Sequence, residues 1–89
     1  MKITFDPVKD AINIDKHGVS LAFGEQIMVD TNHFIVSTVR VEDDEPRFKV
    51  IGQVGERLWT GVFVYRGAAV RFISVRRSND GERRTYHRH

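Results

Sequence analysis

Six arginines stand among the last twenty residues of the chain, VRFISVRRSNDGERRTYHRH, together with a tyrosine and two histidines. Arg71, Arg76 and Arg77 belong to a segment with the alternating pattern of a strand. A guanidinium group is planar and can hold two oxygens of a phosphate at once. A strand and a following helix that concentrate such groups therefore indicate a surface that receives a phosphate-bearing polyanion.

Charge is divided unevenly along the sequence. Residues 1–46 hold four Lys and Arg against nine Asp and Glu, whereas residues 47–89 hold ten against three. An electropositive half of this kind speeds association with a polyanion. The alternative is that the two halves neutralise each other and keep the protein soluble, since the formal net charge is only +2.

Composition excludes several classes of protein. There is no cysteine, which excludes disulfide scaffolds, thiolate zinc sites and cysteine nucleophiles and favours a reducing cytosol. No apolar run approaches the roughly 18 residues of a membrane span, and the start MKITFD lacks the apolar core of a signal peptide. We expect one cytoplasmic domain over residues 1–89, with no metal, no cofactor and no membrane partner.

Two short helices are predicted in the N-terminal third. Asp6-Pro7 supplies an N-cap and a proline at the first helical position, and Gly18 fits the residue after a helix end. These signals bound a helix at 7–17, preceded by a short alternating strand at 2–5. A second helix follows Ser20, which offers another N-cap.

Helical spacing divides the first helix into two sides. Val8, Ala11 and Ile12 recur at this spacing and form its apolar side. The expected polar side consists of Lys9, Asp10, Asn13 and Lys16.

Beyond residue 33 the apolar pattern changes to a period of two. Turn residues separate four predicted strands, at 33–39, 47–54, 57–65 and 69–75. The strand at 57–65 is apolar on both faces, which is typical of a central strand. Asn79-Asp80-Gly81-Glu82 resembles a capping box that opens a C-terminal helix. The predicted order is β-α-α-β-β-β-β-α, an α+β fold in which an antiparallel sheet packs against the N-terminal helices and a short C-terminal helix.

The alternation of side chains decides which arginines share a face of the last strand. In a regular strand Arg71 and Arg76 point to opposite faces, and Arg77 shares the face of Arg71. Arg71 and Arg76 can meet at one phosphate only if the strand bulges or ends near Ser74. The alternative for each arginine is an ion pair at the sheet rim or a solvated charge.

Four blocks of residues occur in order along nearly the whole chain. They are Phe5-Asp6-x-x-Lys9-x-x-x-Asn13-x-x-Lys16-His17-Gly18-Val19, Glu45-x-Arg47-x-x-x-Ile51-Gly52, Arg66-Gly67-x-x-x-Arg71-x-Ile73-Ser74-x-Arg76 and Glu82-Arg83-x-x-Tyr86. This ordered set resembles the BrnT toxin family of the BrnT/BrnA toxin-antitoxin modules. The resemblance implies a RelE-like fold and a ribonuclease activity that blocks translation.

The resemblance also implies partners. A BrnA-type antitoxin is expected to neutralise the toxin in a heterotetramer built through the antitoxin's dimer, and operator DNA is contacted only through that antitoxin. The expected substrate is RNA, cleaved free or on the ribosome. The alternative is a non-catalytic binding module whose basic face receives an antitoxin-like protein.

A ribonuclease that works without a metal turns the RNA's own 2′-hydroxyl into the nucleophile. It needs a base for that hydroxyl, an acid for the leaving 5′-oxygen and cations over the phosphate. The candidates for these catalytic roles are His17, Glu45, Arg47, Arg71, Arg76 and Tyr86. Further RNA contacts, or else plain solvated charges, are expected at Lys16, Arg77, Arg83 and Arg84.

Each of the other candidates has a structural alternative. His17 ends the first helix, where the helix dipole favours the charged imidazolium, so an acid is expected unless the ring only caps the last carbonyls. Glu45 is a general base or one more acid of a solvated loop. Tyr86 stacks on a base or donates a proton, unless it packs the last helix into the core. Arg47 follows Pro46 at a strand start, where a cation can be presented without burial.

Overall fold

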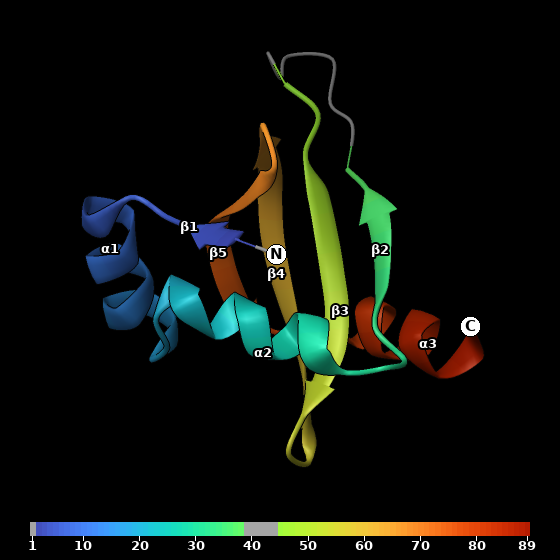
Figure 1. Cartoon of the computed structure of the whole chain (residues 1–89). Helices are drawn as coiled ribbons and strands as arrows, with labels where there is room; N and C mark the ends of the chain where they lie inside the picture. The colour runs from blue at the N-terminus through green and yellow to red at the C-terminus, as the bar shows by residue number, and fades with distance from the viewer. Residues whose placement is uncertain (1, 39–44) are drawn as a thin grey trace.

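Residues 2–38 and 45–89 are described by the computed structural model of the chain (Figure 1). The predicted order of elements and the α+β class are confirmed. The elements are β1 (Lys2–Thr4), α1 (Pro7–His17), the 3-10 turn η1 (Leu21–Phe23), α2 (Gly24–Val29), β2 (Phe34–Ser37), β3 (Phe48–Val54), β4 (Arg57–Arg66), β5 (Ala69–Arg77) and α3 (Asp80–Arg88). Val39, the predicted end of the first long strand, lies outside the described residues. No helix in these ranges is long and apolar enough to cross a membrane.

Capping residues set the ends of α1. The Asp6 carboxylate accepts a hydrogen bond from the Val8 N–H at 2.9 Å. Gly18 has φ 79°, a left-handed conformation that costs glycine little, and its N–H donates to the Ile14 carbonyl at 2.8 Å. Both caps satisfy backbone groups that a helix leaves without partners. The predicted bounds of this helix are confirmed.

The five strands form one sheet in the order β1-β5-β4-β3-β2. β1 runs parallel to β5, and the other neighbouring strands are antiparallel. β4 lies at the centre of the sheet, as its two apolar faces predict. Gly55 opens the β3–β4 hairpin with φ 64°, whereas Glu56 has no positive φ, as in a type II′ turn.

η1 and α2 cross one face of the sheet, where the main core lies (Figure 1). Its buried apolar side chains are Leu21, Ile27, Val50, Phe63, Val70, Phe72 and Val75. The Phe72 ring lies between two glycines, because a Cβ would come within 2.5 Å of it at Gly24 and within 2.6 Å at Gly61. A larger side chain at either glycine would therefore displace Phe72 from the core.

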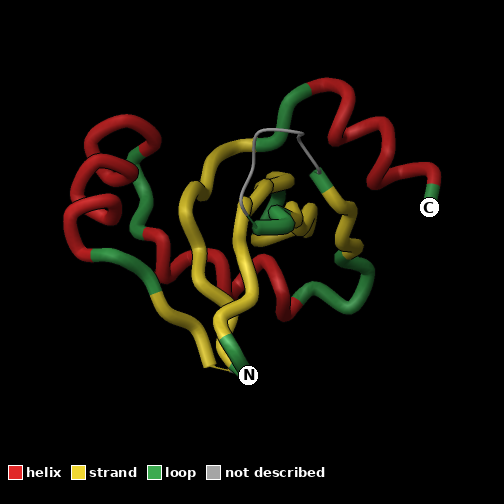
Figure 2. The backbone as a smooth tube through the Cα atoms, turned by 90° about the horizontal axis from the view of Figure 1, so that it is seen from above, coloured by secondary structure: helices red, strands yellow, loops and turns green. Residues whose placement is uncertain are grey.

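α3 packs on the opposite face, so α1 and α3 lie on different sides of the sheet (Figure 2). A second apolar cluster forms there from Ile51, Leu58 and Tyr86, with Phe34 against it. The predicted capping box is confirmed. The Asn79 side chain accepts from the Glu82 N–H at 2.8 Å, and the Glu82 carboxylate accepts from the Asn79 N–H at 2.9 Å. This box fixes the start of α3 directly after β5.

The apolar side of α1 does not face the core. Val8 is 69% exposed and Ile12 is 58% exposed, so the apolar side of this helix faces solvent. The buried residue is Asn13, whose amide accepts from the Val75 N–H at 3.1 Å and donates to the Val75 carbonyl at 2.9 Å. Because β1 pairs with β5 only as far as Arg71, Asn13 satisfies the open edge of β5 beyond that point.

Candidate active site

A β-bulge in β5 decides which basic side chains meet. On β4, Val62 pairs with Ser74, but the next residue, Phe63, pairs with Phe72. Ile73 is therefore an extra residue without an opposite partner, as in a β-bulge. The strand bulges next to Ser74, where the sequence requires it if Arg71 and Arg76 are to share a face.

The extra residue reverses the alternation of the side chains beyond it. Arg71 pairs with Val64 and Arg76 pairs with Thr60, and these two positions of β4 point to the same face. Ser74 lies between the two arginines on that face. We call the face that carries Arg71, Ser74 and Arg76 the arginine face; it is also the face on which α3 packs.

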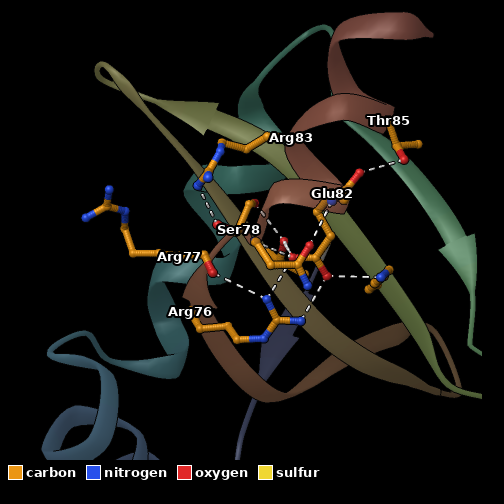
Figure 3. Close-up of polar contacts among 10 residues, drawn as sticks. Arg76, Arg77, Ser78, Glu82, Arg83 and Thr85 are labelled. Atoms are coloured by element: carbon orange, nitrogen blue, oxygen red, sulfur yellow. Dashed lines mark hydrogen bonds and ion pairs between the residues drawn. The ribbon is translucent and has the colours of Figure 1, made fainter.

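Arg76 forms a bidentate pair with Glu82 of α3 (Figure 3). The distance from Nη1 to Oε1 is 2.7 Å, and the distance from Nη2 to Oε2 is 2.9 Å. Nη1 also donates to the Arg77 carbonyl at 3.3 Å. The Arg76 side chain is 30% exposed and that of Glu82 only 3%. The guanidinium therefore extends from a buried carboxylate to the solvent side of the arginine face.

Glu82 is surrounded by hydrogen-bond donors. Lys49 of β3 donates to Oε2 and Thr60 donates to Oε1, each at 3.0 Å. Burial alone would raise the pKa of Glu82, but hydrogen bonds from Arg76, from the capping-box backbone and from Lys49 lower it to about 2. The ionised carboxylate neutralises one of its two cationic partners, so this cluster keeps a net positive charge.

Lys49 is not among the site residues predicted from the sequence, and Glu82 is predicted only as part of the capping box. Alternation along β3 places Lys49 on the same face as Ile51, and this signal is present in the sequence. Its meeting with Arg76 depends on the order of the strands and on the position of α3 over Thr60. Side-chain alternation specifies neither of these.

His17 lies at the end of α1, in a hollow beside the bulge. The hollow has a volume of about 240 Å³ and is lined by α1 side chains, including Lys16, and by Ile73 and Ser74 of β5. Because Ser74 belongs to the arginine face, the hollow adjoins that face at the edge of the sheet. The structure thus brings His17 and Lys16 close to the strand that carries the two arginines.

The surroundings of His17 act on its charge state. Burial lowers the pKa of the imidazole, and the positive charges of Lys16 and Arg76 lower it further. These effects favour the neutral imidazole and oppose the attraction of the helix C-terminus, on which the expected imidazolium rests. A neutral imidazole at pH 7 can accept a proton, which suits a general base better than a general acid.

Residues 5–82 match the family described as ribonuclease toxin, BrnT, of type II toxin-antitoxin system. The chain belongs to the BrnT family. This match confirms the resemblance read from the four sequence blocks, and the N-terminal helices, mostly antiparallel sheet and C-terminal helix are consistent with a RelE-like layout. No individual curated protein matches the chain.

Arg47 joins the arginine face of this BrnT-family chain by continued alternation. It precedes β3 by one residue, and its carbonyl accepts a hydrogen bond from the Thr38 N–H at 2.8 Å. Alternation continued from Lys49 directs the exposed Arg47 side chain to the same face. Since β4 separates β3 from β5, the Cα atoms of Arg47 and Arg71 are about 10 Å apart.

Glu45 is engaged by a different arginine, Arg66. Its carboxylate pairs with Arg66 at the end of β4, at 2.9 Å, and both side chains are largely exposed. The pair matches the expected alternative of a solvated acid. Across residues 2–38 and 45–89, no three His, Cys, Asp or Glu side chains gather in a way that could hold a metal ion.

Tyr86 packs α3 onto the sheet, and its hydroxyl contacts Asp30 instead of the arginines. Its hydroxyl donates to Asp30 Oδ2 at 2.6 Å, and the residue is only 8% exposed. Burial and the hydrogen bond to the Asp30 carboxylate raise the pKa of Tyr86 to about 12. A phenol held in this way anchors α3 to the segment after α2, which matches the packing alternative.

Arg77 lies on the other face of the sheet. It pairs with Trp59 of β4, and its guanidinium lies 5.9 Å from the centre of the Trp59 ring. The prediction that Arg77 shares the face of Arg71 is wrong, because the bulge inverts the parity between them.

Arg83 and Arg84 of α3 differ in their contacts. Arg83 donates to the Ser78 carbonyl at 2.9 Å and forms an ion pair with Asp80, so its guanidinium holds the start of the helix. Arg84 is exposed. Neither is brought to the arginine face by a contact among the described residues.

Proposed function

We propose that this ribonuclease toxin cleaves RNA without a metal, by attack of a 2′-hydroxyl on the adjacent phosphate, and that it does so on the arginine face beside His17. The ribonuclease activity follows from membership of the BrnT family. The observation that supports the location is the bulge at Ile73, because it turns Arg71 and Arg76 to one face next to the His17 hollow.

The cations of the arginine face would bind and stabilise the phosphate. Once the bulge is discounted, the Cα atoms of Arg71 and Arg76 are separated by about 13 Å along the strand. The long Arg71 side chain can reach along this span toward the Arg76 guanidinium, which Glu82 holds in place, so that both contact one sugar-phosphate. Arg47 and Lys49 add positive charge on the β3 side, and Lys16 adds it on the α1 side. Such charges stabilise the phosphorane-like transition state more strongly than the ground state.

His17 would act as the general base. Its imidazole is neutral near pH 7 because burial and two neighbouring cations lower its pKa. It can therefore take the proton of the 2′-hydroxyl when the RNA lies across Ser74. As the 2′-oxygen bonds to phosphorus, the bond from phosphorus to the 5′-oxygen breaks, and water supplies the proton of the leaving 5′-hydroxyl. Glu45 and Tyr86 are bonded elsewhere, so we do not propose proton transfer for them.

The type II family implies a cognate antitoxin in addition to the RNA substrate. We propose that this antitoxin is of the BrnA type, that it binds the operator DNA, and that its dimer joins two toxins in a heterotetramer. The toxin would act in the cytoplasm, where its RNA substrate is present, on RNA that is free or bound to the ribosome.

The chemistry is tested with RNA oligonucleotides that carry a single 2′-deoxynucleotide at the cleaved position. Attack by the 2′-hydroxyl predicts that this substitution abolishes cleavage there and that the all-ribose product ends in a 2′,3′-cyclic phosphate. Cleavage should continue in excess EDTA. Loss of cleavage in EDTA with recovery on added Mg²⁺, or products with 3′-hydroxyl ends, would rule out this mechanism. A purified toxin that binds its antitoxin but cleaves no RNA would favour the binding-module alternative.

A further inference from the structure

The helix α1 presents its apolar side to solvent. Val8 is 69% exposed and Ile12 is 58% exposed, and Ala11 between them is exposed as well. At 100° per residue these three side chains fall within an arc of about 100°, and Asn13 points in nearly the opposite direction. A helix on the surface of a globular protein normally has the reverse orientation. We call Val8, Ala11 and Ile12 the apolar stripe of α1.

The orientation of α1 is fixed by specific contacts on its inner side. Asn13 is hydrogen-bonded to both backbone groups of Val75, and it also donates to the Val19 carbonyl at 2.8 Å. Asp10 accepts from the Ser20 hydroxyl at 2.8 Å and from the Leu21 N–H. Because these polar contacts define the buried side, the helix cannot rotate to bury its apolar stripe without breaking them. The stripe is thus left for a partner.

The surroundings of the stripe indicate the chemistry of that partner. Lys9 and Lys16 flank the stripe on the side of the His17 hollow, and both are exposed. Asp15 continues the stripe at its C-terminal end and is exposed too. A complementary segment would therefore place apolar side chains over Val8 and Ile12 and acidic side chains toward the two lysines.

We propose that the apolar stripe of α1 is the docking surface for an amphipathic, acidic segment of the cognate antitoxin, and that this segment closes the His17 hollow. We infer that the antitoxin binds the stripe because a type II toxin has a protein partner that neutralises it. Contiguous exposed apolar residues bordered by charge are typical of protein interaction sites.

The position of the stripe links docking to inhibition. Ile12 belongs to the stripe and also lines the hollow that contains His17 and Ser74. A segment bound across Ile12 and paired with Lys16 would therefore exclude RNA from the base side of the proposed active site. This consequence rests on the proposed function, whereas docking itself does not depend on it.

The test uses Val8→Glu/Ala11→Glu, two positions of the stripe that do not line the hollow. Negative charge near the N-terminus of a helix interacts favourably with the helix dipole, so the variant should keep its fold. Circular dichroism checks this. The matched control is Val29→Glu, at a residue of α2 that is 73% exposed. We expect the stripe variant to bind the purified antitoxin at least about tenfold more weakly, and the control to bind as the wild type does.

RNA cleavage separates docking from catalysis. Without antitoxin, the stripe variant should cleave RNA at the wild-type rate; with antitoxin, it should need a correspondingly higher antitoxin concentration for inhibition. Unchanged antitoxin affinity in the stripe variant would overturn the proposal. If the wild type itself cleaves no RNA but the affinity loss is found, the catalytic proposal fails while the docking surface stands.

Hydrogen exchange in the wild-type complex provides a second measurement. Antitoxin binding should slow amide exchange in residues 7–17, and an unchanged rate there would count against docking on α1. A second copy of the toxin is the competing occupant. If sedimentation shows a dimer of the free toxin that Val8→Glu/Ala11→Glu dissociates, the stripe is a self-association surface and the proposal is wrong.

Discussion

Arg76 and Glu82 hold each other through two hydrogen bonds, Nη1 to Oε1 at 2.7 Å and Nη2 to Oε2 at 2.9 Å. The same carboxylate accepts from Lys49 and Thr60, so one buried anion positions two cations on the arginine face. Removing one partner of a buried ion pair leaves an uncompensated charge, which costs more than the pair contributes. Glu82 is therefore expected to matter for stability and for the placement of Arg76.

Glu82→Gln should destabilise the protein by about 2–4 kcal/mol at pH 7, because the neutral amide leaves Arg76 and Lys49 without their anion. The free energy of unfolding is measured with urea. Glu25→Gln, at an exposed carboxylate of α2, is the matched control and should change stability by less than about 0.5 kcal/mol. Equal values for the two variants would contradict the assigned role of Glu82.

The same pair predicts an acid limb in the stability of the wild type. The pKa of Glu82 is about 2 in the folded chain against an ordinary value of 4.5, so its contribution is fully present above about pH 5. It is lost as the pH falls from there toward about 2, where the folded carboxylate is protonated as well. Glu82→Gln should lack this part of the acid destabilisation, and the difference in stability between wild type and variant should shrink steadily over that interval.

Arg71→Ala should lower the rate of RNA cleavage on the order of 100-fold, the effect typical of removing one group that stabilises transition-state charge. The control is Arg77→Ala, which removes an arginine from the same strand but from the opposite face, and should change the rate less than about threefold. The comparison is made in kcat/KM at low salt with folding verified. Similar losses in both variants would mean that the bulge does not select the active face.

His17→Ala should reduce cleavage by about 100-fold or more, as expected for loss of a general base. In the wild type, kcat/KM should rise with pH through a value below the ordinary histidine pKa of 6.5 and then level off, because the base must be neutral. His17→Ala should lose this limb, whereas His87→Gln, at an exposed residue of α3, should keep it. A rate that instead falls with rising pH over the same range would assign His17 the acid role.

Local signals in the sequence were sufficient for most of the fold. Asp6 and Gly18 fix the ends of α1 through backbone geometry that depends only on neighbouring residues. Gly55 fixes a hairpin in the same way. Side-chain alternation also predicts that Arg71 and Arg76 share a face only if the strand bulges or ends near Ser74. It does not predict whether the strand bulges.

What could not be predicted depends on contacts between distant segments. The period of α1 identifies an apolar side but not its direction, which Asn13 determines by pairing with Val75, a residue 62 positions away. The Arg76–Glu82 pair likewise requires the turn between β5 and α3 to bring the helix back over Thr60. For Tyr86 the sequence leaves both chemistry and core packing open, because nothing in it places this residue next to Asp30. Each of these interactions is a tertiary contact without a local signature.

Asn13→Ala should destabilise the protein by about 2–4 kcal/mol, because it leaves the buried N–H and carbonyl of Val75 without partners. The free energy of unfolding by urea measures this loss, and hydrogen exchange at the Val75 amide should accelerate strongly. Gln26→Ala, at an exposed position of α2, is the control and should change neither quantity. Because Asn13 also fixes the end of α1, the variant should cleave RNA more slowly even under conditions where it remains folded. An Asn13→Ala protein as stable as the wild type would show that the edge of β5 is satisfied in another way and that α1 is free to turn.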